Sequence, residues 1–257
     1  MKLIPDDVAK YYQINSLKRG HEVFTSLIIY GGRILFLEDH IKRLLQGADF
    51  LFPQIGWNHK HQQVTEVVIN SCAEMVGNFY LRVTIFDDSI HLEKKVLEQG
   101  IDHLKLAVAQ KRKSLGLNPA FLKSSNYLDA DLEILLAKSR HFDDVLFLDT
   151  SEMVTEASSS NIFIVTADNK ILTPPSSSMV LEGILKKNLI DMLPEFGLKV
   201  EEECFSRSTL FAANEIWLTN SVRGIRFVTQ LEEKTFQRSN SHFNLIIKSF
   251  GIYGELL

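Results

Sequence analysis

The sequence predicts a mixed α/β fold in two domains. The chain has 257 residues, which is long for one domain and sufficient for two. Short apolar runs that are typical of strands are interspersed with segments of helical period along the chain. In the second half the expected strands outnumber the expected helices, which favours a mixed or antiparallel sheet with helices packed outside it.

Amino-acid composition excludes several classes of protein. Hydrophobic residues make up 45% and charged residues 23%, which excludes a disordered chain and a coiled coil. The net charge of −4 provides no basic field for nucleic acid. The only cysteines are Cys72 and Cys204, a usage typical of a reducing compartment. Neither a signal peptide nor a membrane span of about 18 apolar residues is found, so we expect a soluble, cytoplasmic protein without a metal site.

The first half is predicted to begin with a β-hairpin over residues 22–36. Its two strand-like runs are separated by Gly31 and Gly32, and two glycines can both adopt the positive φ of a tight hairpin turn. The other elements predicted here are a helix from Leu37 that ends before Pro53, a helix over 60–76, and strands over 79–86 and 104–109.

The sequence pattern changes between about residues 110 and 122. A basic run over 111–113 is followed by glycine, asparagine and proline residues that prevent a regular element. We interpret the basic run as a solvated loop. The whole segment is then the linker between a small domain of residues 1–115 and a larger domain of residues 116–257.

The second half is predicted to contain three helices and five strands. The helices are expected over 126–140, 183–196 and 242–250, and the strands over 145–148, 162–165, 170–173, 215–219 and 225–231. Four leucines recur at helical spacing and form the apolar face of the first of these helices: Leu128, Leu132, Leu135 and Leu136.

Common cofactor and nucleophile motifs do not occur in the sequence. It lacks GxGxxG, GxxxxGKS/T and HExxH, the signatures of dinucleotide, nucleotide and zinc-protease sites. It also lacks a Gly-x-Ser-x-Gly nucleophile turn. One close histidine pair, His59 and His61, lies in a polar stretch, and we interpret it as two solvated side chains.

Three segments could carry chemistry, and each has an ordinary structural alternative. Lys123 follows an apolar pair, where partial desolvation could free its amine as a nucleophile; an exposed surface lysine is the alternative. Glu156 lies before a buried-looking strand and needs a cationic partner, either a cationic heterocycle or an arginine in a structural pair. Residues 182–184 open a helix whose amino terminus could bind phosphate or simply be capped. Together they supply what a pyridoxal phosphate site needs.

Four blocks of sequence, in this order, resemble the fold type IV pyridoxal-phosphate enzymes. This family includes branched-chain aminotransferases, D-amino acid aminotransferases and 4-amino-4-deoxychorismate lyases. The blocks are 20–45 (GHEVFTSLIIYGGRILFLEDHIKRLL), 123–128 (KSSNYL), 154–163 (VTEASSSNIF) and 218–228 (LTNSVRGIRFV). The resemblance implies a two-domain fold like that of D-amino acid aminotransferase, with a small α+β domain followed by a larger sheet-based one. It also implies a small-molecule substrate and a homodimer.

The resemblance implies a role for each matching residue. Lys123 matches the lysine that binds the cofactor covalently and then moves the α-proton of the substrate. Glu156 matches the carboxylate that pairs with the pyridine nitrogen. The other cofactor-binding matches are Arg43 and Ser221 for the phosphate, Tyr127 for the 3-oxygen, the backbone of Ile184 and Leu185 at the phosphate-binding helix, and Asn220; the substrate-binding matches are Tyr80, Arg82 and Arg223.

Two segments depart from the family pattern. The family commonly has Gly-Ile-Thr-Arg at the phosphate-binding helix, whereas residues 183–186 of this chain read GILK. Because Leu185 lacks the threonine hydroxyl, we expect a weaker phosphate contact that depends on backbone N–H groups. The second departure is Asn15–Glu22, which does not show the usual family motif.

Three details favour the lyase within this family. Residues 23–26 (VFTS) are similar to the Phe-Thr-Thr of lyases rather than the Phe-Glu of branched-chain aminotransferases, residues 220–225 resemble a lyase segment, and the chain is short. A lyase would convert aminodeoxychorismate to p-aminobenzoate and pyruvate in folate biosynthesis. Two alternatives stay open. One is an aminotransferase of D- or branched-chain amino acids, because Thr155–Asn161 is equally like the D-amino acid enzymes. The other is an inactive member that only binds the cofactor or a partner.

Overall fold

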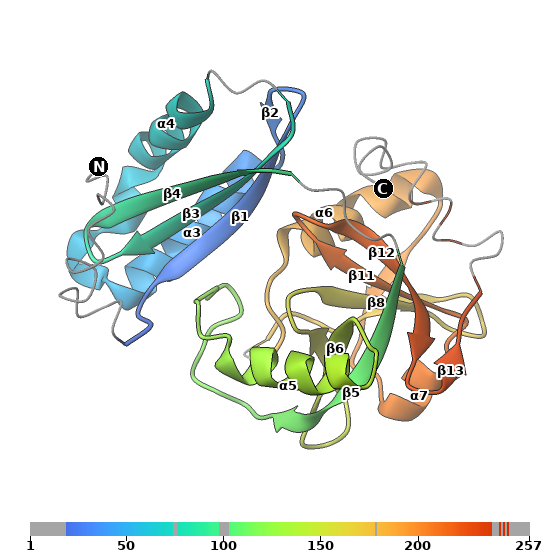
Figure 1. Ribbon diagram of the computed structural model, residues 1–257. Coiled ribbons are helices and arrows are strands. Elements are labelled where there is room, and N and C mark those ends of the chain that lie inside the picture. Colours follow the sequence, from blue (N-terminus) through green and yellow to red (C-terminus); the bar gives the residue numbers. More distant parts are fainter. Residues whose placement is uncertain are drawn as a thin grey trace. The chain divides into compact units, whose positions relative to one another are not determined.

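The computed structural model describes residues 19–73, 77–97, 103–177 and 179–237, together with residues 242, 244 and 246. The chain divides into two compact units, which are drawn in Figure 1. Unit 1 comprises Met1–Glu98 and Phe121–Tyr127, and unit 2 comprises Gln99–Ala120 and Leu128–Leu257. The predicted last helix, 242–250, lies largely outside the described residues.

Unit 1 contains an antiparallel sheet of four strands in the order β2-β1-β3-β4. The strands are β1 (Val23–Tyr30), β2 (Arg33–Ile34), β3 (Phe79–Phe86) and β4 (Ser89–Val96), and the helices are α3 (Leu37–Leu51), η1 (Pro53–Ile55), η2 (Trp57–Lys60) and α4 (His61–Cys72). The predicted hairpin is confirmed, because Tyr30 pairs with Arg33 across Gly31 and Gly32, whose φ angles are 53° and 77°.

The core of unit 1 lies between α3 and its sheet. Residues four apart on α3, such as Ile41 and Leu45, are fully buried together with Leu27 of β1 and Leu81 of β3. Two polar residues of α3, His40 and Arg43, are also buried. A helix that buries polar groups within its core-facing surface must supply them with partners, and these partners define part of the candidate site.

Unit 2 is built on a mixed sheet of nine strands among the described residues. Its order is β10-β9-β8-β11-β12-β5-β6-β7, with β13 paired to β12. The strands are β5 (His103–Lys113), β6 (Asp144–Asp149), β7 (Val154–Ala157), β8 (Asn161–Val165), β9 (Ile171–Thr173), β10 (Val200–Glu202), β11 (Glu215–Asn220), β12 (Gly224–Leu231) and β13 (Lys234–Thr235); the helices are α5 (Leu128–Ser139), α6 (Ile184–Met192), η3 (Leu193–Phe196) and α7 (Arg207–Ala212). The predicted mixed α/β class is confirmed.

The two units differ from the predicted domains, 1–115 and 116–257, in two places. Strand β5, expected in the first half, pairs in parallel with β6 and β12 of the second sheet. It continues to Lys113, so the basic run ends a strand rather than forming a solvated loop. Residues 121–127, expected in or beyond the linker, belong to unit 1, because Ser124 forms a β-bridge with Val23.

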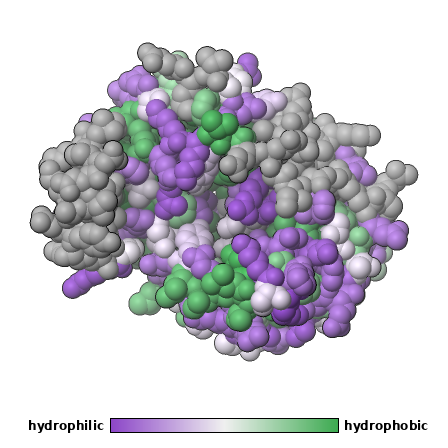
Figure 2. All heavy atoms as spheres, in the orientation of Figure 1, coloured by the Kyte–Doolittle hydropathy of each residue, from purple (hydrophilic) through white to green (hydrophobic). Residues whose placement is uncertain are grey.

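Helix α5 turns its leucines outward. Leu128, Leu132, Leu135 and Leu136 are between 49% and 72% exposed, and Figure 2 shows hydrophobic atoms gathered over this helix. The buried side of α5 instead carries Glu133, whose carboxylate accepts the backbone N–H groups of Gln110 and Lys111 at 2.9 and 2.7 Å. The side of α5 that faces the sheet therefore combines Glu133, which supplies an acceptor for these amides of β5, with the apolar residues Ala130, Ile134 and Ala137.

Within the described part of the chain, no helix has the length and apolar character needed to cross a membrane.

Candidate functional site

Unit 1 brings Lys123 and Tyr127 together. Phe24 donates its backbone N–H to the Lys123 carbonyl at 2.9 Å, which joins this segment to β1. The Lys123 amine donates to the Tyr127 hydroxyl at 2.8 Å and lies 4.6 Å from the centre of the Phe24 ring. A lysine ammonium over an aromatic face is attracted by the ring, and the ring covers one side of it. Tyr127 and Phe24 therefore both contact the amine of Lys123, the predicted nucleophile.

The predicted substrate residues of β3 extend this cluster. The Arg82 guanidinium stacks over the Phe24 ring at 3.6 Å and donates to the Ser125 hydroxyl at 2.6 Å. It also lies 3.5 Å from the Glu22 carboxylate. The Tyr80 hydroxyl lies 3.3 Å from that of Ser26, which pairs with Arg82 across β1 and β3. Arg82 is thus held beside the segment that carries Lys123.

Arg43 and His40 both contact the Thr25 hydroxyl, and neither His40 nor Thr25 was predicted as a site residue. Arg43 Nη2 donates to Thr25 Oγ1 at 3.4 Å, and the same hydroxyl lies 2.6 Å from His40 Nδ1. Burial lowers the pKa of His40 well below 6.5, and the nearby charges of Arg43 and Lys123 lower it further. His40 therefore stays neutral beside two cations. The signal available in the sequence was the spacing of His40 and Arg43 by three positions, which places them on one side of a helix.

In unit 2, Glu156 has a lysine partner. Lys113 donates to Glu156 Oε1 at 2.7 Å, and the backbone N–H of Leu181 donates to Oε2 at 2.8 Å. From the sequence, we expect either a cationic heterocycle or an arginine as the partner of Glu156. The structure shows a lysine instead. A carboxylate offers about four lone-pair positions, so these two donors leave room for a further donor.

Helix α6 begins after Gly183, which lies against the Asn161 side chain. A Cβ atom on Gly183 would lie 1.8 Å from Asn161 Oδ1. Asn161 in turn donates from Nδ2 to the Leu181 carbonyl at 2.9 Å, which holds the approach to the helix. The N-cap position thus has no side chain to occupy the first N–H groups, and Ile184 and Leu185 follow it. This is the arrangement that suits an anion at a helix terminus.

The remaining predicted residues lie at the turn between β11 and β12. Asn220 donates from Nδ2 to the Ser159 carbonyl at 2.6 Å, and its Oδ1 accepts the N–H groups of Val222 and Arg223 at 2.8 and 3.2 Å. The Asn220 side chain therefore shapes the turn that carries Ser221 and Arg223. The sheet places this turn beside Ser159, which precedes strand β8.

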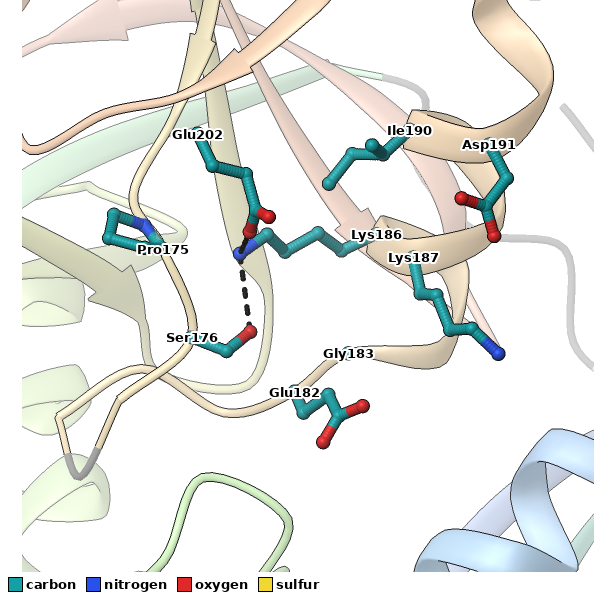
Figure 3. Close-up of a pocket in the computed structure, with 9 residues that line it drawn as sticks. All are labelled: Pro175, Ser176, Glu182, Gly183, Lys186, Lys187, Ile190, Asp191 and Glu202. Atoms are coloured by element: carbon teal, nitrogen blue, oxygen red, sulfur yellow. Dashed lines mark hydrogen bonds and ion pairs between the residues drawn. The ribbon is translucent and has the colours of Figure 1, made fainter.

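A pocket of about 350 Å³ lies beside the start of α6 (Figure 3). Buried Lys186 reaches across it, donating to the Pro174 carbonyl at 2.6 Å and pairing with Glu202 at 2.8 Å. Gly183 borders this pocket, but Glu156 and Ser221 do not. Its lining carries both signs of charge, and we interpret the Lys186 contacts as a brace for α6.

Comparisons with known proteins place the chain in a family. The model for amino-transferase class IV matches residues 22–231. The chain belongs to the class IV aminotransferase family, whose members are pyridoxal-phosphate-dependent enzymes. The expectation of an enzyme of this cofactor class is therefore confirmed.

Relatives within this family carry two kinds of name. A probable branched-chain-amino-acid aminotransferase of Thermotoga maritima is 29% identical over 223 residues, covering 83% of this chain and 78% of the relative. The branched-chain aminotransferase structure of Thermoproteus uzoniensis has a TM-score of 0.82 at 21% identity, covering 93% and 88% of the two chains. A candidate 4-amino-4-deoxychorismate lyase of Legionella pneumophila has a TM-score of 0.80 at 21% identity, covering 97% and 96%. The two structural likenesses show the fold.

The neutral state of His40 makes stability depend on pH. The unfolded chain binds a proton on this imidazole below about pH 6.5, whereas the folded protein does not. Stability is therefore retained above that pH and lost as the pH falls below it, by up to about 1.4 kcal/mol per pH unit. We expect His40→Asn to reduce this slope, measured by urea unfolding at pH 7.0, 6.0 and 5.5. Exposed His59, changed to Asn, is the control, and equal slopes for His40→Asn and the unaltered protein would contradict the assignment.

Proposed function

We propose that this chain is a pyridoxal-phosphate-dependent lyase that converts 4-amino-4-deoxychorismate to p-aminobenzoate and pyruvate. The observation that carries the proposal is the cluster of Lys123, Tyr127, Phe24 and Arg82 in unit 1. It combines an amine in a partly shielded environment with a cation that can receive a carboxylate. The resemblance of residues 220–225 to the corresponding segment of lyases supports the choice of reaction.

The residues present fit the cofactor. A phosphate suits the start of α6, where the N-cap Gly183 provides no side-chain cap, and a protonated ring nitrogen suits the remaining lone pairs of Glu156. We propose that the cofactor is held by Lys123, Tyr127 and Arg43 of unit 1 and by Glu156, Ile184, Leu185, Asn220 and Ser221 of unit 2. When bound, pyridoxal phosphate withdraws electrons from the carbon that carries the substrate's amino group.

The reaction then needs two proton transfers and the cleavage of one C–O bond. The Lys123 amine takes the proton from the carbon that bears the amino group, while Tyr127 and the Phe24 ring hold the amine in place. The bond between the ring carbon and the ether oxygen breaks. The enolpyruvyl group leaves with this oxygen and takes up a proton to become pyruvate. The remaining ring is aromatic, which drives the reaction forward. We propose that Arg82, Tyr80 and Arg223 bind the substrate, Arg82 through one of its carboxylates.

Buried Thr25 is a second feature that supports the lyase. Its hydroxyl is fully buried and is shared by His40 and Arg43. The branched-chain aminotransferases that the chain resembles have Glu at this position of the hairpin. A carboxylate here would face the Arg43 guanidinium and change the charge around it. The threonine instead places a neutral hydroxyl beside Arg43.

An aminotransferase is the second candidate. It is favoured by the names of the relatives, among them the proteins of Thermotoga maritima and Aquifex aeolicus, both called probable branched-chain-amino-acid aminotransferases. In an aminotransferase the same Lys123 amine would move the α-proton of an amino acid. A member that binds the cofactor without turnover is the third, and the presence of both Lys123 and Glu156 argues against it.

We also propose that the protein acts in the cytoplasm. Cys72 and Cys204 are both free thiols in the described part of the chain. Free thiols persist in a reducing compartment such as the cytoplasm. We propose that folate biosynthesis uses the product there.

Covalent attachment tests the role of Lys123. We expect the purified protein with added pyridoxal phosphate to show a visible absorbance band, and borohydride to fix the cofactor to Lys123 in a peptide mass map. Lys123→Ala should bind without fixation, whereas Lys111→Ala, which alters an exposed lysine, should behave as the unaltered protein. A protein that stays colourless, or that is labelled at another residue, would contradict the assignment of Lys123 as the attachment site.

Substrate assays separate the candidate reactions. We expect pyruvate to form from 4-amino-4-deoxychorismate, and no glutamate to form from L-leucine or D-alanine with 2-oxoglutarate. Pyruvate formation should fall by at least about 10³-fold in Lys123→Ala, because the proton acceptor is lost. Glutamate formation alone would select the aminotransferase. A cofactor fixed to Lys123 without turnover in any assay would select the inactive member.

We propose, finally, that the enzyme is a homodimer in which the leucine face of α5 is covered by the second copy. The face consists of Leu128, Leu132, Leu135 and Leu136, and apolar patches of this kind mark interaction surfaces. We expect light scattering to report a dimer, and Leu135→Glu to shift it to a monomer by placing a charge in the interface. Leu117→Glu alters an exposed leucine outside α5 and should stay dimeric; a dimeric Leu135→Glu protein would contradict the placement.

A further inference from the structure

We propose that Lys113 is a positioning residue that holds Glu156 in place for the ring nitrogen of the cofactor. The inference rests on the proposed function, because it takes Glu156 as the partner of that nitrogen. It assigns a role to a basic residue that the sequence indicates only as part of a solvated run.

The fold brings Lys113 to Glu156 across a strand. Lys113 is the last residue of β5 and Glu156 lies in β7, and β6 runs between these two strands. The Lys113 side chain crosses β6 above Phe147, with its ammonium 5.3 Å from the centre of that ring. It ends 2.7 Å from Glu156 Oε1 and 3.0 Å from the Met179 carbonyl. Three contacts therefore fix one ammonium.

The same contacts involve the segment that leads to α6. Lys113 binds the carbonyl of Met179, and Glu156 Oε2 accepts the N–H of Leu181, two residues before Gly183. Lys113, Glu156 and residues 179–181 thus form one bonded group. Because Gly183 starts the helix proposed for the phosphate, this group sets the distance between the carboxylate and the phosphate-binding N–H groups. Two anchor points of a rigid ligand need such a fixed distance.

Burial makes the pair effective. The side chains of Lys113 and Glu156 are 27% and 17% exposed, so water screens the pair less than it would on the surface. Without Lys113 the carboxylate would keep only the Leu181 N–H and could rotate. Cofactor binding would then have to order the Glu156 side chain, and the entropy lost in this ordering weakens the binding.

The chain offers a matched control. Lys111 lies on the same strand and pairs with Asp129 at 2.5 Å, but both side chains are more than half exposed. An exposed pair of this kind contributes little to stability. Lys111→Met therefore removes a lysine and an ion pair from β5 without touching Glu156.

The experiment measures cofactor binding to the full-length protein. Cofactor-free protein is titrated with pyridoxal phosphate for Lys113→Met, Lys113→Arg, Glu156→Gln, the double variant Lys113→Met/Glu156→Gln, and Lys111→Met. We expect Lys113→Met to raise Kd about tenfold, as for loss of one charge-assisted hydrogen bond. Lys113→Arg should restore most of the affinity, and Lys111→Met should bind as the unaltered protein. The absorbance maximum of bound cofactor should shift in the same direction in Lys113→Met and Glu156→Gln.

The double variant decides whether Lys113 acts through Glu156. We expect its Kd to match that of Glu156→Gln, because an effect transmitted by the carboxylate disappears with the carboxylate. Unchanged affinity in Lys113→Met, or effects that simply multiply, would overturn the inference while leaving Glu156 as the cofactor's partner. Unaltered binding in Glu156→Gln would instead contradict the proposed function. If Lys113→Met fails to fold in a thermal melt, Lys113→Gln replaces it, with a smaller rise in Kd expected.

Discussion

The backbone hydrogen bond from Phe24 to the Lys123 carbonyl determines where the Lys123 amine of unit 1 lies. Together with the bridge between Val23 and Ser124, it attaches a short segment to the edge of a hairpin strand. Once that backbone is attached, the Lys123 side chain can lie over Phe24 and reach the Tyr127 hydroxyl. Backbone contacts therefore fix the segment that carries Lys123, independently of the contacts of its side chain.

Charge is distributed unevenly in this protein. The whole chain carries a net charge of −4, yet Arg43, Arg82 and Lys123 lie in one part of unit 1. Three cations close together repel one another, and the structure limits this cost in two ways. Buried His40 stays neutral, and Arg82 is placed over an aromatic ring and near Glu22. An acidic protein can in this way present a positive region to an anionic ligand.

Local patterns in the sequence predicted the hairpin at Gly31 and Gly32, the strand at 79–86 and the mixed sheet, because these depend on turn chemistry and on periodicity. The partners of β5 could not be predicted, because its pairing depends on distant strands: β12 lies more than a hundred residues along the chain, and β6 also lies beyond an intervening helix. For the same reason Lys113 was interpreted as solvated and the outward leucines of α5 as an ordinary apolar face. Residues of the candidate site were found by resemblance to a family; their neighbours His40 and Thr25 required the tertiary structure.

The path of the chain through the two units restricts how this protein can be divided. Unit 1 takes its lysine segment, Phe121–Tyr127, from between two stretches of unit 2, Gln99–Ala120 and the part that begins at Leu128. No single cut yields both units whole, and a fragment ending before residue 121 would lack the amine altogether. Exchange of units between relatives by simple recombination would therefore separate Lys123 from the hairpin that positions it. Exchange of either unit as a whole requires at least two junctions in the chain.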